Sequence, residues 1–479
     1  MFDIVIESGT VVSPAASQVL DVAVQGEKIV ALGRPGTLAD EARRRVDARG
    51  LYVLPGVIDP HVHSFAEAWD RKLPGFAVET RAAAHGGTTT IIEYGWQRKG
   101  TGVLQSVDER LAEFDGQAWV DFAVNAMVIS PSWDVLHEVD GVLDRGIPCF
   151  KILVHEREDE PPEDALCYAL MQKLAERGGL LSIHAENASM CRYFTRKLLA
   201  EGKTGVEYFP RSRPPIAEAE AVQRMTFLAE RTGAAIYFPH LSSGVAVALV
   251  GEAQARGLPV YCETCPHYLL FTDEVYRQER AIQFVRFPPI QSAADQAALW
   301  KGVLDSTINC IGSDHVSAYL SRKKELSQGK PFNEMPGGMG QVETVLSVMY
   351  TEGVAAGRIT INRLVELLST NPARIFGLYP KKGIISPGSD ADIVLYDPEP
   401  RRTLTSGDLH MGLDYTIYEG YPLRGAPVMT ILRGEVSVER GTYVGTRRGQ
   451  FLKRVIGRAV LSGQLSRAAH GPSPTLLAR

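Results

Sequence analysis

The sequence has no apolar run long enough to cross a bilayer, and it has no strong excess of either charge. Its 479 residues include 51 basic and 56 acidic side chains, so the formal net charge is only −5. A membrane-spanning helix needs about 20 consecutive apolar residues, and a nucleic-acid surface needs a marked basic patch. These absences argue against a membrane protein and against a nucleic-acid partner.

Cysteine is scarce, and no basic and then apolar leader opens the chain. The six cysteines are scattered, mostly among apolar residues, at positions 149, 167, 191, 262, 265 and 310. Cys262 and Cys265 have the spacing of a redox or zinc pair, but no second pair accompanies them, so we expect no structural zinc. We interpret the six as reduced core thiols, and the missing leader as typical of a cytoplasmic protein.

Both ends of the chain lack long helical periodicity and contain short β-type runs. Residues 2–6 and 21–24 near the start, and 392–396 and 428–432 near the end, are such runs, separated by turn residues. The simplest packing joins the two ends in one small β-sandwich domain, residues 1–55 plus 376–450. The C-terminal tail, 451–479, is basic and then Ser/Pro/Ala-rich, and we predict a loose end or an arm over a neighbouring subunit.

Between these ends, strand-like apolar runs alternate with helical patterns. Expected strands include 88–92, 121–128 and 258–261, and expected helices include 105–114, 163–177 and 218–231. The units add up to eight βα pairs over residues 56–375, which is typical of a (β/α)8 TIM barrel, an α/β fold. Such barrels carry their chemistry at the carboxyl ends of the strands.

Two histidines, one residue apart, follow the first of these strands. His61 and His63 end the run that contains Val57 and Ile58. In an extended chain residues i and i+2 point to the same side, so the pair can aim two imidazoles at one metal ion. The alternative is a pair of histidines satisfied by other partners, and a lone His-x-His would favour that alternative.

Other apolar runs end in further side chains of metal-site type, namely Lys151, His184, His240 and Asp314. Because the carboxyl ends of barrel strands meet at one face, five such strand ends predict a shared metal site. These residue types fit a two-metal hydrolase in which Lys151, once carboxylated by carbon dioxide, bridges two cations. A surface or salt-bridged lysine is the alternative, and the apolar neighbours of Lys151 argue against it.

Two cations held close together make hydroxide available near neutral pH. We expect this bridging hydroxide to attack a carbonyl that a metal also polarises. Asp314 would take the proton of the water and pass it to the leaving nitrogen. The predicted catalytic residues are therefore Asp314 and Lys151.

The motifs of the chain resemble those of the cyclic amidohydrolases in the amidohydrolase superfamily. The resemblance is strongest to the dihydropyrimidinase and hydantoinase branch, with its allantoinase and dihydroorotase relatives, and it covers nearly the whole chain. It is carried by residues 54–63 (LPGVIDPHVH), 86–90 (GGTTT), 150–151 (FK), 184–187 (HAEN), 240–242 (HLS), 263–269 (ETCPHYL), 312–315 (GSDH), 369–378 (STNPARIFGL), 410–415 (HMGLDY) and 449–454 (GQFLKR).

This resemblance implies a (β/α)8 barrel with a β-sandwich, two Zn²⁺ ions per chain (or Mn²⁺ or Co²⁺), and a homotetramer or homodimer. It also implies that an N6-carboxylated lysine bridges the two metals. Position by position, the implied ligands are His61, His63 and Asp314 on one metal, His184 and His240 on the other, and Lys151 on both.

Three positions depart from the hydantoinase pattern, and all three concern contacts with the substrate. The branch has an oxyanion-stabilising tyrosine where this chain has Glu156, a serine where it has Phe287, and an asparagine where it has Gly337. His155 or Arg157 could replace the tyrosine as oxyanion donor, or could be a solvated loop residue. We therefore expect simple hydantoin and dihydrouracil to be poor substrates.

The sequence thus predicts a binuclear metal hydrolase that opens the amide C–N bond of a cyclic amide, such as a hydantoin, a dihydropyrimidine, allantoin or a cyclic imide. One alternative is a non-catalytic, dihydropyrimidinase-like assembly or binding protein, which would have lost metal ligands that are all present here. The other is a barrel deaminase, which would normally use one metal and no bridging lysine.

Overall fold

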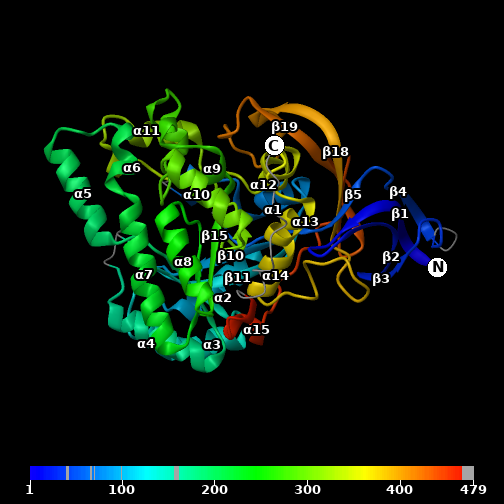
Figure 1. Ribbon diagram of the computed structural model, residues 1–479, viewed down its shortest axis with the longest axis horizontal. Coiled ribbons are helices and arrows are strands. Elements are labelled where there is room, and N and C mark those ends of the chain that lie inside the picture. Colours follow the sequence, from blue (N-terminus) through cyan, green and yellow to red (C-terminus); the bar gives the residue numbers. More distant parts are fainter. Residues whose placement is uncertain (39–41, 65–66, 69–70, 99, 156–160, 466–479) are drawn as a thin grey trace.

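The centre of the chain is a ring of parallel strands wrapped by helices (Figure 1). The computed structural model describes residues 1–38, 42–64, 67–68, 71–98, 100–155 and 161–465. The ring closes where β17 (His315–Val316) pairs in parallel with β7 (Val62–His63). Its eight strands pair in sequence order and are β6 (Val57–Asp59), β10 (Thr88–Trp96), β11 (Asp121–Val128), β12 (Cys149–Leu153), β13 (Leu180–His184), β14 (Ala235–Phe238), β15 (Val260–Thr264) and β16 (Cys310–Ile311).

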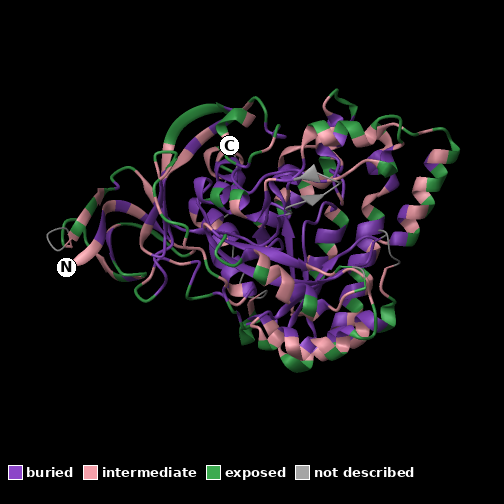
Figure 2. Ribbon diagram, turned by 180° about the vertical axis from the view of Figure 1, so that it is seen from behind, coloured by how far each residue is buried: buried purple, intermediate pink, exposed green. Residues whose placement is uncertain are grey.

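Helices in the connections cover the outside of this ring. Strands β11 and β13 are buried along their whole length, because side chains fill the ring on one face and helices cover the other (Figure 2). This arrangement confirms the predicted (β/α)8 barrel. The main covering helices are α1 (Gly75–His85), α2 (Val103–Phe114), α3 (Val135–Asp144), α4 (Asp164–Arg177), α7 (Pro215–Thr232), α8 (Gly244–Ala255), α10 (Ala293–Leu304), α13 (Ile361–Val365) and α14 (Asn371–Ile375).

Further helices lie in the longer connections. They are α5 (Ala188–Ala200), α6 (Phe209–Ser212), α9 (Pro266–Leu270), α11 (Leu320–Ser327) and α12 (Val345–Met349). None of the described helices has both the length and the apolar character that a membrane span requires.

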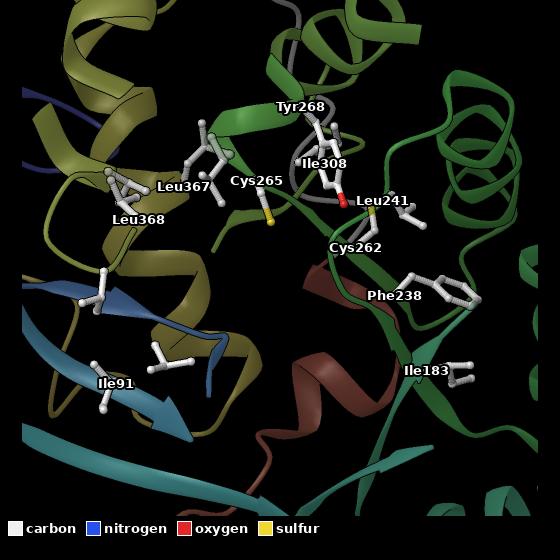
Figure 3. Close-up of a cluster of buried hydrophobic side chains, with 14 of the residues drawn as sticks. Ile91, Ile183, Phe238, Leu241, Cys262, Cys265, Tyr268, Ile308, Leu367 and Leu368 are labelled. Atoms are coloured by element: carbon white, nitrogen blue, oxygen red, sulfur yellow. The ribbon is translucent and has the colours of Figure 1, made fainter. Parts of the chain in front are cut away.

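The main core lies between the strands and the helices that cover them. Figure 3 shows Ile91, Ile183 and Phe238 from three barrel strands in one cluster with Leu367 and Leu368 from the last helical stretch. The six cysteines are buried and form no disulfide with one another, as predicted. Burial of each large apolar side chain in this core stabilises the barrel by about 1.5–3 kcal/mol.

Both chain ends build one nine-stranded sheet beside the barrel. β18 pairs antiparallel with β5, so Ile393 lies opposite Pro55 and the two ends join. The turns at Gly26 and Gly434 touch, since a Cβ on Gly434 would lie 2.0 Å from the Gly26 carbonyl oxygen. Where a β-sandwich was predicted, the two chain ends thus share one sheet with a buried apolar cluster of its own, which is called the β-domain below. Its strands are β1 (Phe2–Val12), β2 (Ser17–Gln25), β3 (Lys28–Gly33), β4 (Ala42–Asp47), β5 (Tyr52–Pro55), β18 (Ile393–Leu404), β19 (Tyr421–Leu432), β20 (Glu435–Glu439) and β21 (Thr442–Tyr443).

The described part of the tail packs against the barrel of its own chain. Phe451 forms a bridge with Phe122, and the buried Arg454 donates to Asn125 Oδ1 over 2.8 Å. Helix α15 (Arg458–Leu461) follows, and Tyr261 donates its hydroxyl to the carbonyl of Val460 over 2.8 Å. The prediction of a loose end is therefore wrong up to residue 465, because apolar and arginine side chains anchor this segment.

Candidate metal centre

The six side chains predicted as metal ligands lie at the carboxyl ends of barrel strands. None of them is more than 5% exposed. Burial of this many polar groups requires that they satisfy one another or a bound ion. His61 and His63 follow β6, Lys151 lies in β12, His184 ends β13, His240 lies two residues after β14, and Asp314 lies three residues after β16.

One group of these side chains centres on His61. Its Nε2 atom lies 3.1 Å from Nε2 of His63, 2.8 Å from Nζ of Lys151 and 3.3 Å from Oδ1 of Asp314. Ligand atoms of His61, His63 and Asp314 all lie within 4.8 Å of one another. Burial, and then the charge of Lys151, hold the pKa of His61 well below its usual range. The imidazole is therefore neutral, which is the form that binds a metal.

A second group centres on His184. Its Nδ1 atom lies 3.0 Å from Nε2 of His240, and its Nε2 atom lies 2.8 Å from Glu186. His155, His184 and Glu186 also offer ligand atoms within 4.8 Å of one another. Nδ1 of His240 is buried without a hydrogen-bond partner among the described residues. Imidazole nitrogens that face one another in this way fit a first-row divalent cation such as zinc.

Carboxylates behind the histidines fix the orientation of the rings. Oε1 of Glu263, at the end of β15, lies 3.1 Å from Nδ1 of His61, and its Oε2 accepts the hydroxyl of Tyr237 over 2.7 Å. Glu186 likewise lies beside Nε2 of His184 and fixes the orientation of that ring. Arg213 holds Glu186 in place by donating to its carboxylate over 2.9 Å. Such carboxylate–histidine pairs select the tautomer that faces a metal.

His240 and Asp314 both have left-handed backbone conformations, with φ of 43° and 46°. Non-glycine residues rarely adopt this region, and exceptions cluster at functional sites. Asp59 ties the surrounding loops together by accepting the N–H groups of His61 over 3.2 Å and Ser313 over 3.0 Å. Burial raises the pKa of Asp59 to about 6.

His63, Lys151, His184, His240 and Asp314 line a cavity of about 440 Å³, and His61 is fully buried beside them. Three of the predicted substrate residues, His155, Phe287 and Gly337, line this cavity, whereas Glu156 and Arg157 lie outside the described residues. The remaining wall is mostly apolar. It comprises Trp96, Met127, Leu153, Val316, Met335 and Pro336, together with Gly338 and Arg286.

Two of the departures from the hydantoinase pattern touch one another. A Cβ on Gly337 would lie 3.0 Å from Cε2 of Phe287, so the phenyl ring occupies space that an asparagine would need. The ring of Phe287 is also parallel to that of His155, with centroids 6.5 Å apart. Positions 287 and 337 are therefore neighbours in the cavity wall, so a side chain added at 337 would press on the Phe287 ring.

Sequence reasoning missed Glu186, Glu263 and Arg286. Each of the three is a single charged residue within an apolar run or a family motif. Such an isolated charge was the one feature of the sequence that could have identified it as a functional residue. Their partners, however, come from distant parts of the chain, such as Tyr237 for Glu263 and Asp314 for Arg286. Only the folded barrel brings these pairs together.

Comparison with known proteins agrees with this geometry. Residues 52–436 match the amidohydrolase family. The D-hydantoinase of Rhizobium radiobacter is 37% identical over 460 residues, which cover 94% of this chain and 99% of that protein. A solved D-hydantoinase structure superposes with a TM-score of 0.91 at 36% identity, covering 95% of this chain and 99% of the other. A solved dihydropyrimidinase from Brevibacillus agri gives 0.91 at 33% identity, covering 96% and 100%.

Proposed function

The chain belongs to the amidohydrolase family. We therefore propose that its buried centre hydrolyses the amide C–N bond of a cyclic amide. Similarity to D-hydantoinases and a dihydropyrimidinase over nearly the full length supports this substrate class. The observation that carries the proposal is the convergence of His61, His63 and Asp314, with ligand atoms within 4.8 Å of one another. His63 and Asp314 of this group line a mostly apolar cavity.

We assign two divalent cations to this centre, with zinc as the first choice and manganese or cobalt as replacements. The assigned ligands are His61, His63 and Asp314 on one cation, His184 and His240 on the other, and a carboxylated Lys151 between them. When bound, such cations lower the pKa of a water and polarise a carbonyl.

The residues of the chain supply positioning and proton transfer. Asp314 accepts the proton of the attacking water and delivers it to the ring nitrogen as the C–N bond breaks. The water oxygen bonds to the carbonyl carbon as the C–N bond breaks, so the ring opens to a single product with a carboxylate at that carbon and an N–H at the former ring nitrogen. Glu263 and Glu186 hold the histidine rings, while the apolar wall excludes bulk water.

The test is metal analysis followed by activity measurements on the zinc-loaded full chain. We expect about two metals per chain after zinc and bicarbonate are supplied, and ring opening of at least one member of a panel of hydantoins, dihydropyrimidines, allantoin and cyclic imides. Less than about half a metal per chain, with no ring opened, contradicts the proposal.

The alternatives considered from the sequence receive no support from the relatives reported above. These are hydantoinases and a dihydropyrimidinase, neither deaminases nor non-catalytic proteins. A homotetramer or homodimer remains our proposal for the assembly.

A further inference from the structure

Arg286 is a buried arginine in the wall of the cavity. It lies in the connection between β15 and α10 and is only 3% exposed. One terminal nitrogen, Nη2, donates to the backbone carbonyl of Asp314 over 3.2 Å and contacts its carboxylate. The other two nitrogens, Nε and Nη1, are buried without a hydrogen-bond partner among the described residues.

Unpaired N–H groups on a buried cation are costly, so they indicate a partner that the protein chain does not supply. Among the lining residues that the structure describes, Arg286 is the one charged side chain that the proposed reaction does not use. Phe287 and Val316, which line the same cavity, are apolar, and Gly337 has no side chain. The free donors of Arg286 are therefore available to a ligand in the cavity.

The chemistry of the guanidinium group selects that ligand. Its planar donors match the two oxygens of a carboxylate, and charge-assisted hydrogen bonds of this kind are about twice as strong as neutral ones. An unsubstituted hydantoin or dihydrouracil ring is neutral and carries no such group.

We propose that Arg286 determines specificity by binding a carboxylate substituent on the cyclic amide substrate. This inference rests on the proposed function and names its substrate class: a cyclic amide with an anionic side group. Phe287 and Met335 then cover the apolar part of the ring, while the contact with Asp314 places the carboxylate beside the reacting amide.

The experiment compares two substrates of nearly equal shape, hydantoin-5-acetate and its neutral amide, hydantoin-5-acetamide. The zinc-loaded full chain is expected to prefer the carboxylate by at least about tenfold in kcat/KM, the effect of one hydrogen bond to a charged group. In Arg286→Gln this ratio is expected to fall by at least about tenfold, mainly through KM. Arg277→Gln, which removes a surface arginine of the same connection, is expected to keep the ratio.

Two results overturn the proposal. Equal losses on both substrates in Arg286→Gln mean that Arg286 only positions Asp314, and no preference of the wild-type chain for the carboxylate means that no anion is recognised. The wild-type comparison remains valid if the variant fails to fold.

A third measurement separates this inference from the proposed function. If the wild-type chain hydrolyses neither compound, the proposed function fails for these rings, and calorimetry of the same two compounds still measures recognition. Tighter binding of the acetate supports the role of Arg286, and equal or weaker binding contradicts it.

Discussion

Lys151 is the residue on which the two-metal proposal depends most. Its Nζ lies 2.8 Å from Nε2 of His61 and 4.2 Å from the centre of the Tyr94 ring, and the side chain is buried. We expect Lys151→Ala to lose bound metal and activity together, because the bridging oxygens vanish. Elemental analysis and kcat measurements check this, with Lys173→Ala on the surface of α4 as the control.

Chemical rescue makes this prediction sharper. Short carboxylic acids added to Lys151→Ala should restore part of the rate and part of the bound metal, because they supply carboxylate oxygens. A Lys151→Ala variant with full activity contradicts the carboxylated bridge.

Asp314 is predicted to be both a metal ligand and the proton carrier. Asp314→Asn keeps an oxygen for the metal, and asparagine tolerates the φ of 46° at this position. It cannot accept a proton near neutral pH, so turnover should fall at least ~10²-fold while most of the metal stays bound. Steady-state kinetics and metal analysis of the same sample decide the matter, and a wild-type rate refutes the assignment.

At the level of secondary structure, the sequence predicted the strands that are buried on both faces. Strand β11 has the predicted bounds, 121–128, because apolar residues fill it except at Asp121 and Asn125. The predicted strand at 258–261 lies at Val260–Thr264 instead, since the polar Glu263 and Thr264 conceal its end. Their burial depends on partners such as Tyr237, which lies far away in the sequence.

The loops that carry the site were less predictable. The short run that ends at Asp314 was predicted as a strand, yet β16 covers only Cys310–Ile311 of it. The chain leaves the sheet at this point because the N–H of Ser313 donates to Asp59 over 3.0 Å. The positions of the proposed ligands could therefore be predicted from strand ends, whereas the contacts that orient these side chains could not.

The coupling of positions 287 and 337 can be measured directly. Gly337→Asn alone forces an added side chain against the Phe287 ring, since its Cβ would lie 3.0 Å from Cε2. In Phe287→Ser the same asparagine has room. We expect urea denaturation of the wild type, both single variants and the double variant to give a coupling free energy of about 1 kcal/mol or more. Purely additive effects contradict this coupling.

Glu218, near the start of α7, gives a pH-dependent contribution to stability. It accepts the N–H groups of Ser242 over 3.1 Å and Ser243 over 2.6 Å. Burial raises its pKa to about 8 from an ordinary value of 4.5. Between these values the folded chain holds a proton that the unfolded chain has lost, so stability falls as the pH rises, by at most about 1.4 kcal/mol per pH unit.

Glu218→Gln should remove this dependence. Urea unfolding from about pH 5 to about pH 8 should show a shallower loss of stability in this variant than in the wild type. Glu230→Gln, farther along α7 and nearer the surface, should keep the wild-type slope. An unchanged slope in Glu218→Gln contradicts the assignment.

Across the whole molecule, one buried charge cluster joins the barrel to the β-domain. Nζ of Lys382 lies 2.8 Å from Asp121 in β11, 3.2 Å from Asp390 and 2.5 Å from Asp392 beside β18. Arg433, after β19, adds a contact of 3.1 Å to Asp121. Burial lowers the pKa of Lys382, but the three carboxylates outweigh it and raise the pKa above its usual value. The two domains are thus held together by charge as well as by apolar packing.

Lys382→Met tests this junction, because it leaves the three carboxylates buried without their central cation. Removing one partner of a buried ion pair costs about 3–5 kcal/mol, and chemical denaturation should show a loss of this size. Lys381→Met, at the exposed neighbouring position, should cost little.

The loss of stability in Lys382→Met should also depend on pH. Without the cation the buried carboxylates bind protons more readily, so mild acid should relieve part of the loss. The difference in unfolding free energy between this variant and the wild type should therefore be smaller at about pH 5 than at about pH 8. A small loss, or one independent of pH, means that apolar packing alone joins the domains.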